Sequence, residues 1–257
     1  MDEFFDEFLV TFVPVVVYWV YSAIYEILGF FNNYRLHSKT DEETENMVSK
    51  FDVVKGVIFQ QVIQAATSFL FFQLIHDKSS RNTKYPSSFL RVAGQIFIAM
   101  VVVDAWQYVI HRCMHANNFL YRNFHSWHHR VVAPYAFAAQ YNHPLDGFLT
   151  ETLGGALAFF ISGMSPRTSV FFFSFATIKG IDDHCGHLLP LNPFHLLFSN
   201  NTAFHDVHHQ HSGTKCNFSQ PFFVVWDKIF DTYVPYTISK REGGGYEAKI
   251  AKGSCQA

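Results

Sequence analysis

The sequence has 257 residues, of which 49% are hydrophobic and 16% are charged, and its formal net charge is -2. A soluble domain typically carries about 25% charged residues, so the deficit indicates a protein of the lipid bilayer. The near-zero net charge argues against a nucleic-acid-binding protein and against a strongly basic protein of the membrane surface. We interpret residues 1–257 as one integral-membrane domain.

Three long apolar segments occupy the first half of the chain. Residues 9–31, 56–75 and 92–110 are each long enough to cross a hydrocarbon core, which takes a helix of about 20 residues. Acidic residues precede the first segment, whereas a signal peptide begins with basic residues. We therefore predict three membrane-spanning helices, the first of which stays as an anchor.

The charged residues that flank these segments bear on the orientation of the chain across the membrane. Basic residues between positions 35 and 55 favour an amino terminus outside the cytosol, which places the end of the third span on the cytosolic face. The basic stretch 78–91 argues for the opposite orientation. Two glycosylation acceptor sequences, Asn200-Asn201-Thr202 and Asn217-Phe218-Ser219, are expected to stay unmodified on a cytosolic face and so to report the topology.

A further apolar region covers residues 148–181. It is interrupted by Gly163-Met164-Ser165-Pro166, a group of helix breakers that predicts a hairpin. The two arms are shorter than ideal spans, which leaves open two full crossings, a tilted or shallow pair, and a buried pair that leans on other helices. In each arrangement the chain returns to its starting side, so residues before and after the hairpin can meet.

Eight histidines form three clusters around this hairpin. The clusters are His111 and His115; His125, His128 and His129; and His205, His208 and His209. Spacings of three and four residues allow imidazoles to converge on one face of a helix. A surface patch of histidines is the alternative, and the recurrence of three clusters disfavours it. Because one zinc site takes at most four ligands, eight donors indicate two metal ions with open coordination positions.

The other histidines differ in their sequence surroundings. His143 and His184 lie at the polar borders of the hairpin and are predicted to complete the ligand set. The roles of His187 and His211 stay undecided, and His37, His76 and His195 are interpreted as structural. The predicted metal ligands are therefore His111, His115, His125, His128, His129, His143, His184, His205, His208 and His209.

Carboxylates and one tyrosine crowd the same region of the sequence. A metal-ligating imidazole usually donates its second N–H to a carboxylate or a carbonyl, which fixes the orientation of the ring. Ordinary helix capping is the alternative for each carboxylate. The candidates for this supporting role are Asp104, Tyr108, Asp182, Asp183, Asp206 and Asp227. The four cysteines form no C-x-x-C pair and are expected to be reduced thiols.

Residues 104–236 carry these motifs in a recognisable order. They are Asp104-Ala-Trp-Gln-Tyr-Val-Ile-His-Arg-Cys-Met-His115, His125-x-x-His-His129, Asn142-His-Pro144, His205-x-x-His-His209 and Trp226-Asp-x-x-Phe-x-Thr-Tyr233. In them the chain resembles the fatty acid hydroxylase superfamily. Three further stretches, 34–38, 162–168 and 217–221, resemble the sphingoid-base C-4 hydroxylases, or sphinganine C4-monooxygenases, within it.

The resemblance implies an all-α, multi-pass enzyme of the endoplasmic reticulum membrane. Its histidine-rich cap is expected to face the cytosol and to hold two iron ions as Fe²⁺, which zinc can replace during purification. The implied reaction is oxygen-dependent C-4 hydroxylation of sphinganine, free or within ceramide, to phytosphingosine-type bases. Dioxygen is the co-substrate, and the electrons come from cytochrome b5 and its NAD(P)H reductase.

The implied chemistry agrees with what the residues permit. Hydroxylation of an unactivated C–H bond is beyond any side-chain acid or base and requires a redox metal with dioxygen. The sequence contains no G-x-G-x-x-G fingerprint, so the electrons are expected from a separate partner.

Two positions depart from the family pattern. Asp146 stands where relatives often have Glu, and Asp231 stands where they usually have Gly. Neither aspartate is expected to touch a ligand, and Asp tolerates a left-handed backbone better than most residues.

Three other functions stay open at this point. A sterol C-4 methyl oxidase or a lipid desaturase would use the same ligands. A histidine-rich metal transporter would instead spread ionisable residues through its spans, whereas here they gather at the ends of the spans. The choice between free base and ceramide, the chain length of the substrate and the oligomeric state also stay open.

Overall fold

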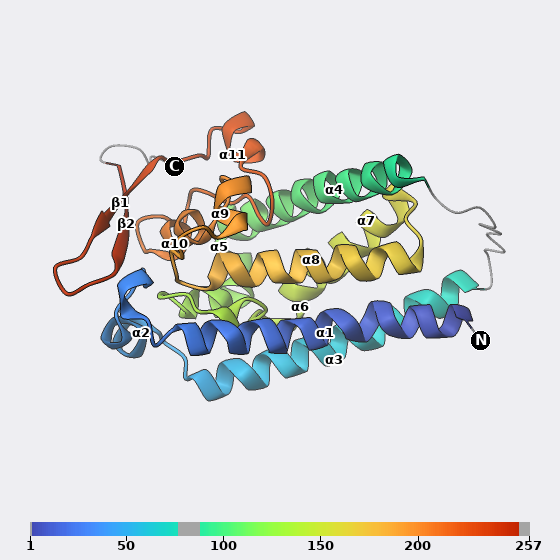
Figure 1. Cartoon of the computed structure of the whole chain (residues 1–257), viewed down its shortest axis with the longest axis horizontal. Helices are drawn as coiled ribbons and strands as arrows, with labels where there is room; N and C mark the ends of the chain where they lie inside the picture. Colours follow the sequence, from blue (N-terminus) through green and yellow to red (C-terminus); the bar gives the residue numbers. More distant parts are fainter. Residues whose placement is uncertain (1, 77–87, 252–257) are drawn as a thin grey trace.

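The protein is built around three long helices that run along its longest axis (Figure 1). A computed structural model describes residues 2–76 and 88–251. The long helices are α1 (Asp2–Leu28), α3 (Lys50–His76) and α4 (Phe89–Ala116). Each is long and apolar enough to cross a membrane, over Phe5–Leu28, Lys50–Leu74 and Phe89–Ala116. The prediction of a mostly helical chain with three candidate spans is confirmed.

The outer faces of these helices are apolar. Val16 and Val20 on α1, Phe59 and Val62 on α3, and Phe97 on α4 are all more than half exposed. So many exposed large apolar side chains are typical of a surface that faces lipid.

The hairpin consists of two helices of unequal length. It begins with a π-helical turn, η4 (Phe148–Thr152), and continues as α7 (Leu153–Ser162) and α8 (Pro166–His184). Gly163 ends α7 in the left-handed conformation, with a φ of 63°, and the Ser165 side chain caps the start of α8. α7 packs against α4, and α8 packs against α1. At 10 residues α7 is about 15 Å long, which is half the thickness of a hydrocarbon core.

Short elements gather at one end of the bundle and form a cap (Figure 1). Helices α1, α4 and α8 all reach this end with their carboxyl termini, and α3 begins there. The short helices are η1 (Asn32–Tyr34), α2 (Lys39–Glu45), α5 (Asn118–Asn123), η2 (His125–Arg130), η3 (Ala136–Ala138), α6 (Pro144–Gly147), α9 (Pro193–Leu197), α10 (Thr202–His209) and α11 (Val225–Ile229).

The cap also contains a small sheet, so the expectation of an all-α fold is incomplete. Strands β1 (Tyr236–Lys240) and β2 (Tyr246–Ile250) pair antiparallel, with Tyr236 opposite Ile250 and Lys240 opposite Tyr246. Gly244 and Gly245 lie in the connecting turn with φ values of 90° and 80°, which glycine adopts readily. The sheet packs against α10 and so braces the last histidine cluster.

Both glycosylation acceptor sequences lie inside the fold. Asn200 is fully buried and donates from its side chain to the Ser219 carbonyl at 2.9 Å. Asn217 is also fully buried, and its side chain bonds to both the backbone N–H and the carbonyl of Val234. A glycan on either asparagine is incompatible with these contacts, so their modification state does not report topology.

The cysteines differ from one another. Cys113 and Cys185 are free thiols, as expected, but Cys216 is disulfide-bonded, so that expectation is wrong at Cys216. The position of Cys255 falls outside the described residues.

Candidate metal centre

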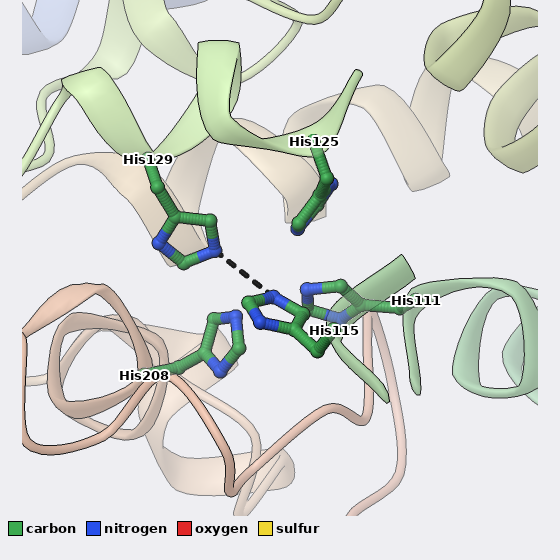
Figure 2. Close-up of side chains that lie close together, drawn as sticks. All are labelled: His111, His115, His125, His129 and His208. Atoms are coloured by element: carbon green, nitrogen blue, oxygen red, sulfur yellow. Dashed lines mark hydrogen bonds between the residues drawn. The ribbon is translucent and has the colours of Figure 1, made fainter. Parts of the chain in front are cut away.

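Nine histidines converge in the cap as two groups. Within each group one ligand atom from every residue lies within 4.8 Å of the others. Figure 2 shows the five imidazoles of the first group pointing toward a common centre. The first group is His111, His115, His125, His129 and His208, and the second group is His128, His184, His205 and His209.

The two H-x-x-H-H motifs are each divided between the groups. In the first motif His128 belongs to the second group while its neighbours His125 and His129 belong to the first. In the other motif only His208 belongs to the first group. The three imidazoles of one motif therefore do not all belong to the same group. Each motif instead spans both groups, which makes the two groups parts of one structure.

The groups adjoin one another closely. The rings of His128 and His129, consecutive in sequence, have centroids 5.7 Å apart although they serve different groups. The rings of His129 and His209 stack across the boundary at 4.8 Å. This adjacency suits a dinuclear centre better than two independent sites.

His143 stands apart from both groups. Its Nδ1 atom accepts a hydrogen bond from the backbone N–H of Leu145 at 3.2 Å, so it caps the start of α6. Its ring packs edge-on against Phe124 and Trp127, each at 5.0 Å between centroids. The structure therefore does not bring this predicted ligand to the centre.

The other histidines also lie outside the two groups. His187 is buried, with its Nδ1 against the Cys185 carbonyl at 2.5 Å, and His211 is exposed. His37 pairs with Asp206 at 2.5 Å, and His195 pairs with Asp182 at 3.3 Å. The side chain of His76 falls outside the described residues.

Backbone carbonyls orient most of the grouped imidazoles through Nδ1. Because a carbonyl only accepts, Nδ1 must carry the proton, which leaves Nε2 with a free lone pair. The carbonyl acceptors are Phe218 for His111 (2.8 Å), Tyr141 for His128 (3.2 Å), Gly180 for His184 (2.8 Å), Cys216 for His208 (2.7 Å) and Val131 for His209 (2.8 Å).

The Nε2 atoms meet one another instead of ordinary hydrogen-bond donors. His205 Nε2 lies 2.9 Å from His184 Nε2 and 3.0 Å from His209 Nε2. Among the described residues, the buried Nε2 atoms of His111, His125 and His208 have no hydrogen-bond partner. Lone pairs that are buried, unpartnered and convergent are the donor set that a metal with imidazole affinity requires. The residues therefore fit a pair of metal ions.

Among the described residues, one carboxylate, that of Asp146, hydrogen-bonds to a grouped histidine. Its Oδ2 atom lies 2.7 Å from His125 Nδ1, and both side chains are buried. The expectation that Asp146 touches no ligand is therefore wrong. Its shorter side chain, carried by α6, still reaches the imidazole of η2. Asp231, the other departure from the family pattern, adopts the left-handed conformation with a φ of 54°.

Asp146→Ala should lower metal affinity roughly 10- to 100-fold, because His125 loses the partner that holds its ring. Asp231→Ala, which removes an exposed carboxylate, is the control and should keep full affinity. Metal content after dialysis against graded chelator concentrations measures the change. Equal retention of metal by both variants would show that Asp146 does not support the centre.

Two of the candidate supporting residues, Asp104 and Asp227, act through the loop 217–223. Asp104 accepts from the backbone N–H groups of Phe222 at 3.0 Å and Phe223 at 2.6 Å. Asp227 accepts from the N–H groups of Phe218 and Ser219 at 2.9 and 2.7 Å. This loop supplies the Phe218 carbonyl that orients His111. Tyr108 adds a hydroxyl contact to Thr232 at 3.0 Å and stacks on Phe230.

The other three candidate carboxylates have different partners. Asp182 accepts from the Tyr25 hydroxyl at 2.5 Å and from the Asn192 amide at 2.6 Å. Asp183 forms an ion pair with Lys179 inside α8. Asp206 pairs with His37. Within the described ranges, none of these three hydrogen-bonds to a histidine of either group, so they brace the cap.

The centre strongly disfavours protonation. Burial is the largest cause that lowers the pKa of six grouped histidines outside the spans, to about 4 for His184 and to about 3 for His208. The pKa values of His128, His129, His205 and His209 fall well below the usual range for the same reason. These imidazoles are therefore neutral at physiological pH, as metal ligation requires.

Acid should destabilise the metal-free protein. Between the ordinary histidine pKa of about 6.5 and the lowered folded values, the unfolded chain binds protons that the folded chain does not, so stability falls as pH falls. His37, Glu151 and Asp183 act in the opposite sense, because their pKa values are raised in the folded protein. Asp206 raises the pKa of His37 against the effect of burial, and burial raises the pKa values of Glu151 and Asp183 to about 7. These three groups oppose six histidines, so the histidines set the direction. Thermal unfolding midpoints of metal-free protein in detergent should drop from pH 7 to pH 4.5, and a flat or rising profile would contradict the account.

A cavity of about 290 Å³ begins at the metal centre and extends into the helical bundle. Its inner end is lined by His125, His128 and His184, and it continues between α1, α3, α7 and α8 along apolar side chains. A second cavity, of about 430 Å³, lies between α1 and α3 and shares Thr11, Ala65 and Phe72 with the first. The two cavities together lead from the histidines toward the lipid-facing surface of the bundle.

Comparisons with known proteins agree with this geometry. A family model described as "Fatty acid hydroxylase" matches residues 96–232. Sphinganine C4-monooxygenase 2 and Sphinganine C4-monooxygenase 1 of Arabidopsis thaliana are 59% and 57% identical, each over 96% of this chain and 95% of the relative. Very-long-chain aldehyde decarbonylase GL1-9 of Oryza sativa subsp. japonica is 50% identical over 95% of both chains. No solved structure matches the chain.

Proposed function

Because the chain belongs to the fatty acid hydroxylase family, we propose that it is a membrane monooxygenase that hydroxylates C-4 of sphinganine, free or within ceramide. Two relatives, at 59% and 57% identity, carry this activity in their names. The single observation that carries the proposal is the joining of two histidine groups to an apolar cavity. A metal centre that opens onto an apolar cavity within a membrane bundle suits a lipid whose target carbon must be brought to the metals.

We propose nine metal ligands instead of the ten expected from the sequence, because His143 is occupied as a helix cap. The first group would hold one iron ion and the second group the other. When bound, the iron pair, with dioxygen and two external electrons, supplies the oxidising power that an unactivated C–H bond requires.

The protein's own residues position the substrate and exclude water. Phe71, Phe159 and Phe172 line the apolar part of the cavity, where an alkyl tail replaces water. Helix α1 contributes Val10 and Val15 to the same wall. The tail would thus be held in line with the bundle, and the carbon near its polar end would face the histidines.

We infer a location in the endoplasmic reticulum membrane, with the cap on the cytosolic face. The three candidate spans support a membrane protein, and the basic residues between positions 35 and 55 lie at the cap end of the bundle. A cytosolic cap would accept electrons from cytochrome b5. The NAD(P)H reductase of cytochrome b5 would supply those electrons. The enzyme therefore requires an external donor for turnover.

Expression in yeast that lacks its own sphingoid C-4 hydroxylase tests the function. Trihydroxy long-chain bases should appear at the expense of dihydroxy bases, and His128→Ala should prevent this. Absence of trihydroxy bases from cells in which the protein accumulates with bound iron would overturn the assignment. Alkane formation from long-chain aldehydes in the same cells would instead support the activity named for the rice relative.

A further inference from the structure

A carboxylate without a neighbouring cation, Glu151, lines the cavity beside the metal centre. Its Oε2 atom accepts from the Gln64 amide at 2.5 Å, and its Oε1 atom accepts from the Asn142 amide at 2.9 Å. In the part of the chain that the structure describes, no basic side chain lies within salt-bridge distance of it. The protein encloses Glu151, and its remaining accessible surface faces the cavity.

Further oxygen acceptors face the same space without partners. The Oδ1 atom of Asp146 and the Oδ2 atom of Asp183 are buried, and neither has a hydrogen-bond partner among the described residues. The side chains of both residues line the cavity, and each is at most 2% exposed. Buried acceptors normally have donors, so this end of the cavity is matched to a ligand that brings N–H or O–H groups.

We propose that this inner end is a headgroup site for a lipid with a protonated amine, in which Glu151 is the counterion of the ammonium group. Asp146 and Asp183 accept hydrogen bonds from the remaining polar hydrogens of the headgroup. The inference rests on the proposed function and sharpens it. A free sphingoid base carries an ammonium group, whereas the amide nitrogen of ceramide cannot be protonated, so the site selects the free base.

The location of Glu151 fits the position of the reacting carbon. The amine of sphinganine is on C-2, two carbons from C-4, so the ammonium must bind close to the metals. Asn142, which donates to Glu151, directly follows Tyr141, whose carbonyl orients His128. Glu151 is therefore connected, through the Asn142 side chain and the adjoining peptide, to the Tyr141 carbonyl that orients the proposed ligand His128.

The rest of the cavity accommodates the tail. From Tyr18 to Phe8, which line the first and second cavities respectively, α1 rises by about 15 Å. This length runs away from the histidines along apolar side chains. A headgroup at Glu151 therefore directs an extended alkyl chain toward the opening between α1 and α3.

The acidity of Glu151 agrees with this role. Burial raises its pKa to about 7, although the Gln64 and Asn142 amides oppose the effect. A bound ammonium group favours the ionised carboxylate and removes the cost of burying an isolated charge.

Binding to the iron-loaded, full-length protein in lipid nanodiscs tests the site. Unlabelled sphinganine and N-acetylsphinganine compete against radiolabelled sphinganine for the wild type, Glu151→Gln and the control Glu26→Gln, which removes an exposed carboxylate of α1. The wild type and the control should prefer sphinganine roughly 30-fold or more, as expected for a buried charge pair. Glu151→Gln should lose that preference while its affinity for N-acetylsphinganine changes less than about threefold.

The outcomes separate the two proposals. Equal binding of both lipids by the wild type, or full preference in a Glu151→Gln protein that retains both metal ions, overturns the headgroup site. The comparison within the wild type needs no variant, so a folding defect in Glu151→Gln leaves the test intact. If the wild type binds sphinganine through Glu151 but forms no 4-hydroxylated product, the reaction is wrong and the headgroup site stands.

Discussion

His208→Ala should leave about one metal ion per chain and reduce turnover by roughly 10³-fold or more, because a dinuclear centre that loses one ion loses several kcal/mol of transition-state stabilisation. His208 belongs to the first histidine group, and its neighbour His209 belongs to the second. His209→Ala should therefore also abolish turnover, but by removal of the other ion. Elemental analysis gives the metal stoichiometry, and a spectroscopic comparison of the two variants should give different signals for the iron that remains.

His211→Ala and His143→Ala are the matched controls. His211 is exposed three residues after the proposed ligand His208, and His143 caps α6. Both variants should retain two metal ions and turnover within about threefold of the wild type. Loss of a metal ion from His143→Ala would show that His143 is a metal ligand after all. Identical spectra from His208→Ala and His209→Ala would contradict the division of the motif between two ions.

Lys179→Met should destabilise the protein by about 3–5 kcal/mol, because it leaves the Asp183 carboxylate buried without its cation. Lys179 is 0% exposed and forms its ion pair with Asp183 one turn farther along α8. Thermal or denaturant unfolding in detergent measures the loss. The structure predicts the large effect because neither group can turn to water.

Two further variants isolate the charge. Lys179→Met combined with Asp183→Leu should recover most of the stability, since an apolar pair replaces the ion pair. Lys55→Met breaks an exposed pair with Asp52 and should cost less than about 1 kcal/mol. If the double variant is no more stable than Lys179→Met alone, packing and not charge is the cause.

The properties that follow from local sequence could be predicted. The lengths of the apolar segments indicate the three long helices, because the thickness of the bilayer fixes the minimum length of a spanning helix. The number and spacing of the histidines indicate metal binding, because a dense set of nitrogen donors has few other uses. Asp104 and Asp227 also lie near the centre, as their positions in the motifs indicate, although each acts through a loop.

What could not be predicted depends on how distant segments meet. The division of each H-x-x-H-H motif is set by η2 and α10 facing each other, and no spacing within one motif contains that information. His143 is next to a proline that begins α6, which is an available sign of a helix cap. Asp146 and His125 are 21 residues apart in the sequence, and their contact depends on where the fold places α6 and η2. The sheet had a local signal, two short alternating segments around three consecutive glycines, which the strength of the helical pattern obscured.

The orientation of the imidazoles by the main chain has an evolutionary consequence. Five grouped histidines are fixed by backbone carbonyls, which every amino acid at those positions supplies equally well. Mutations of the cavity wall can then accumulate while the imidazole rings keep their orientation. A lineage can thus exchange one lipid for another without rebuilding its chemistry, which fits the differing activities in the names of the Arabidopsis and rice relatives at 50–59% identity.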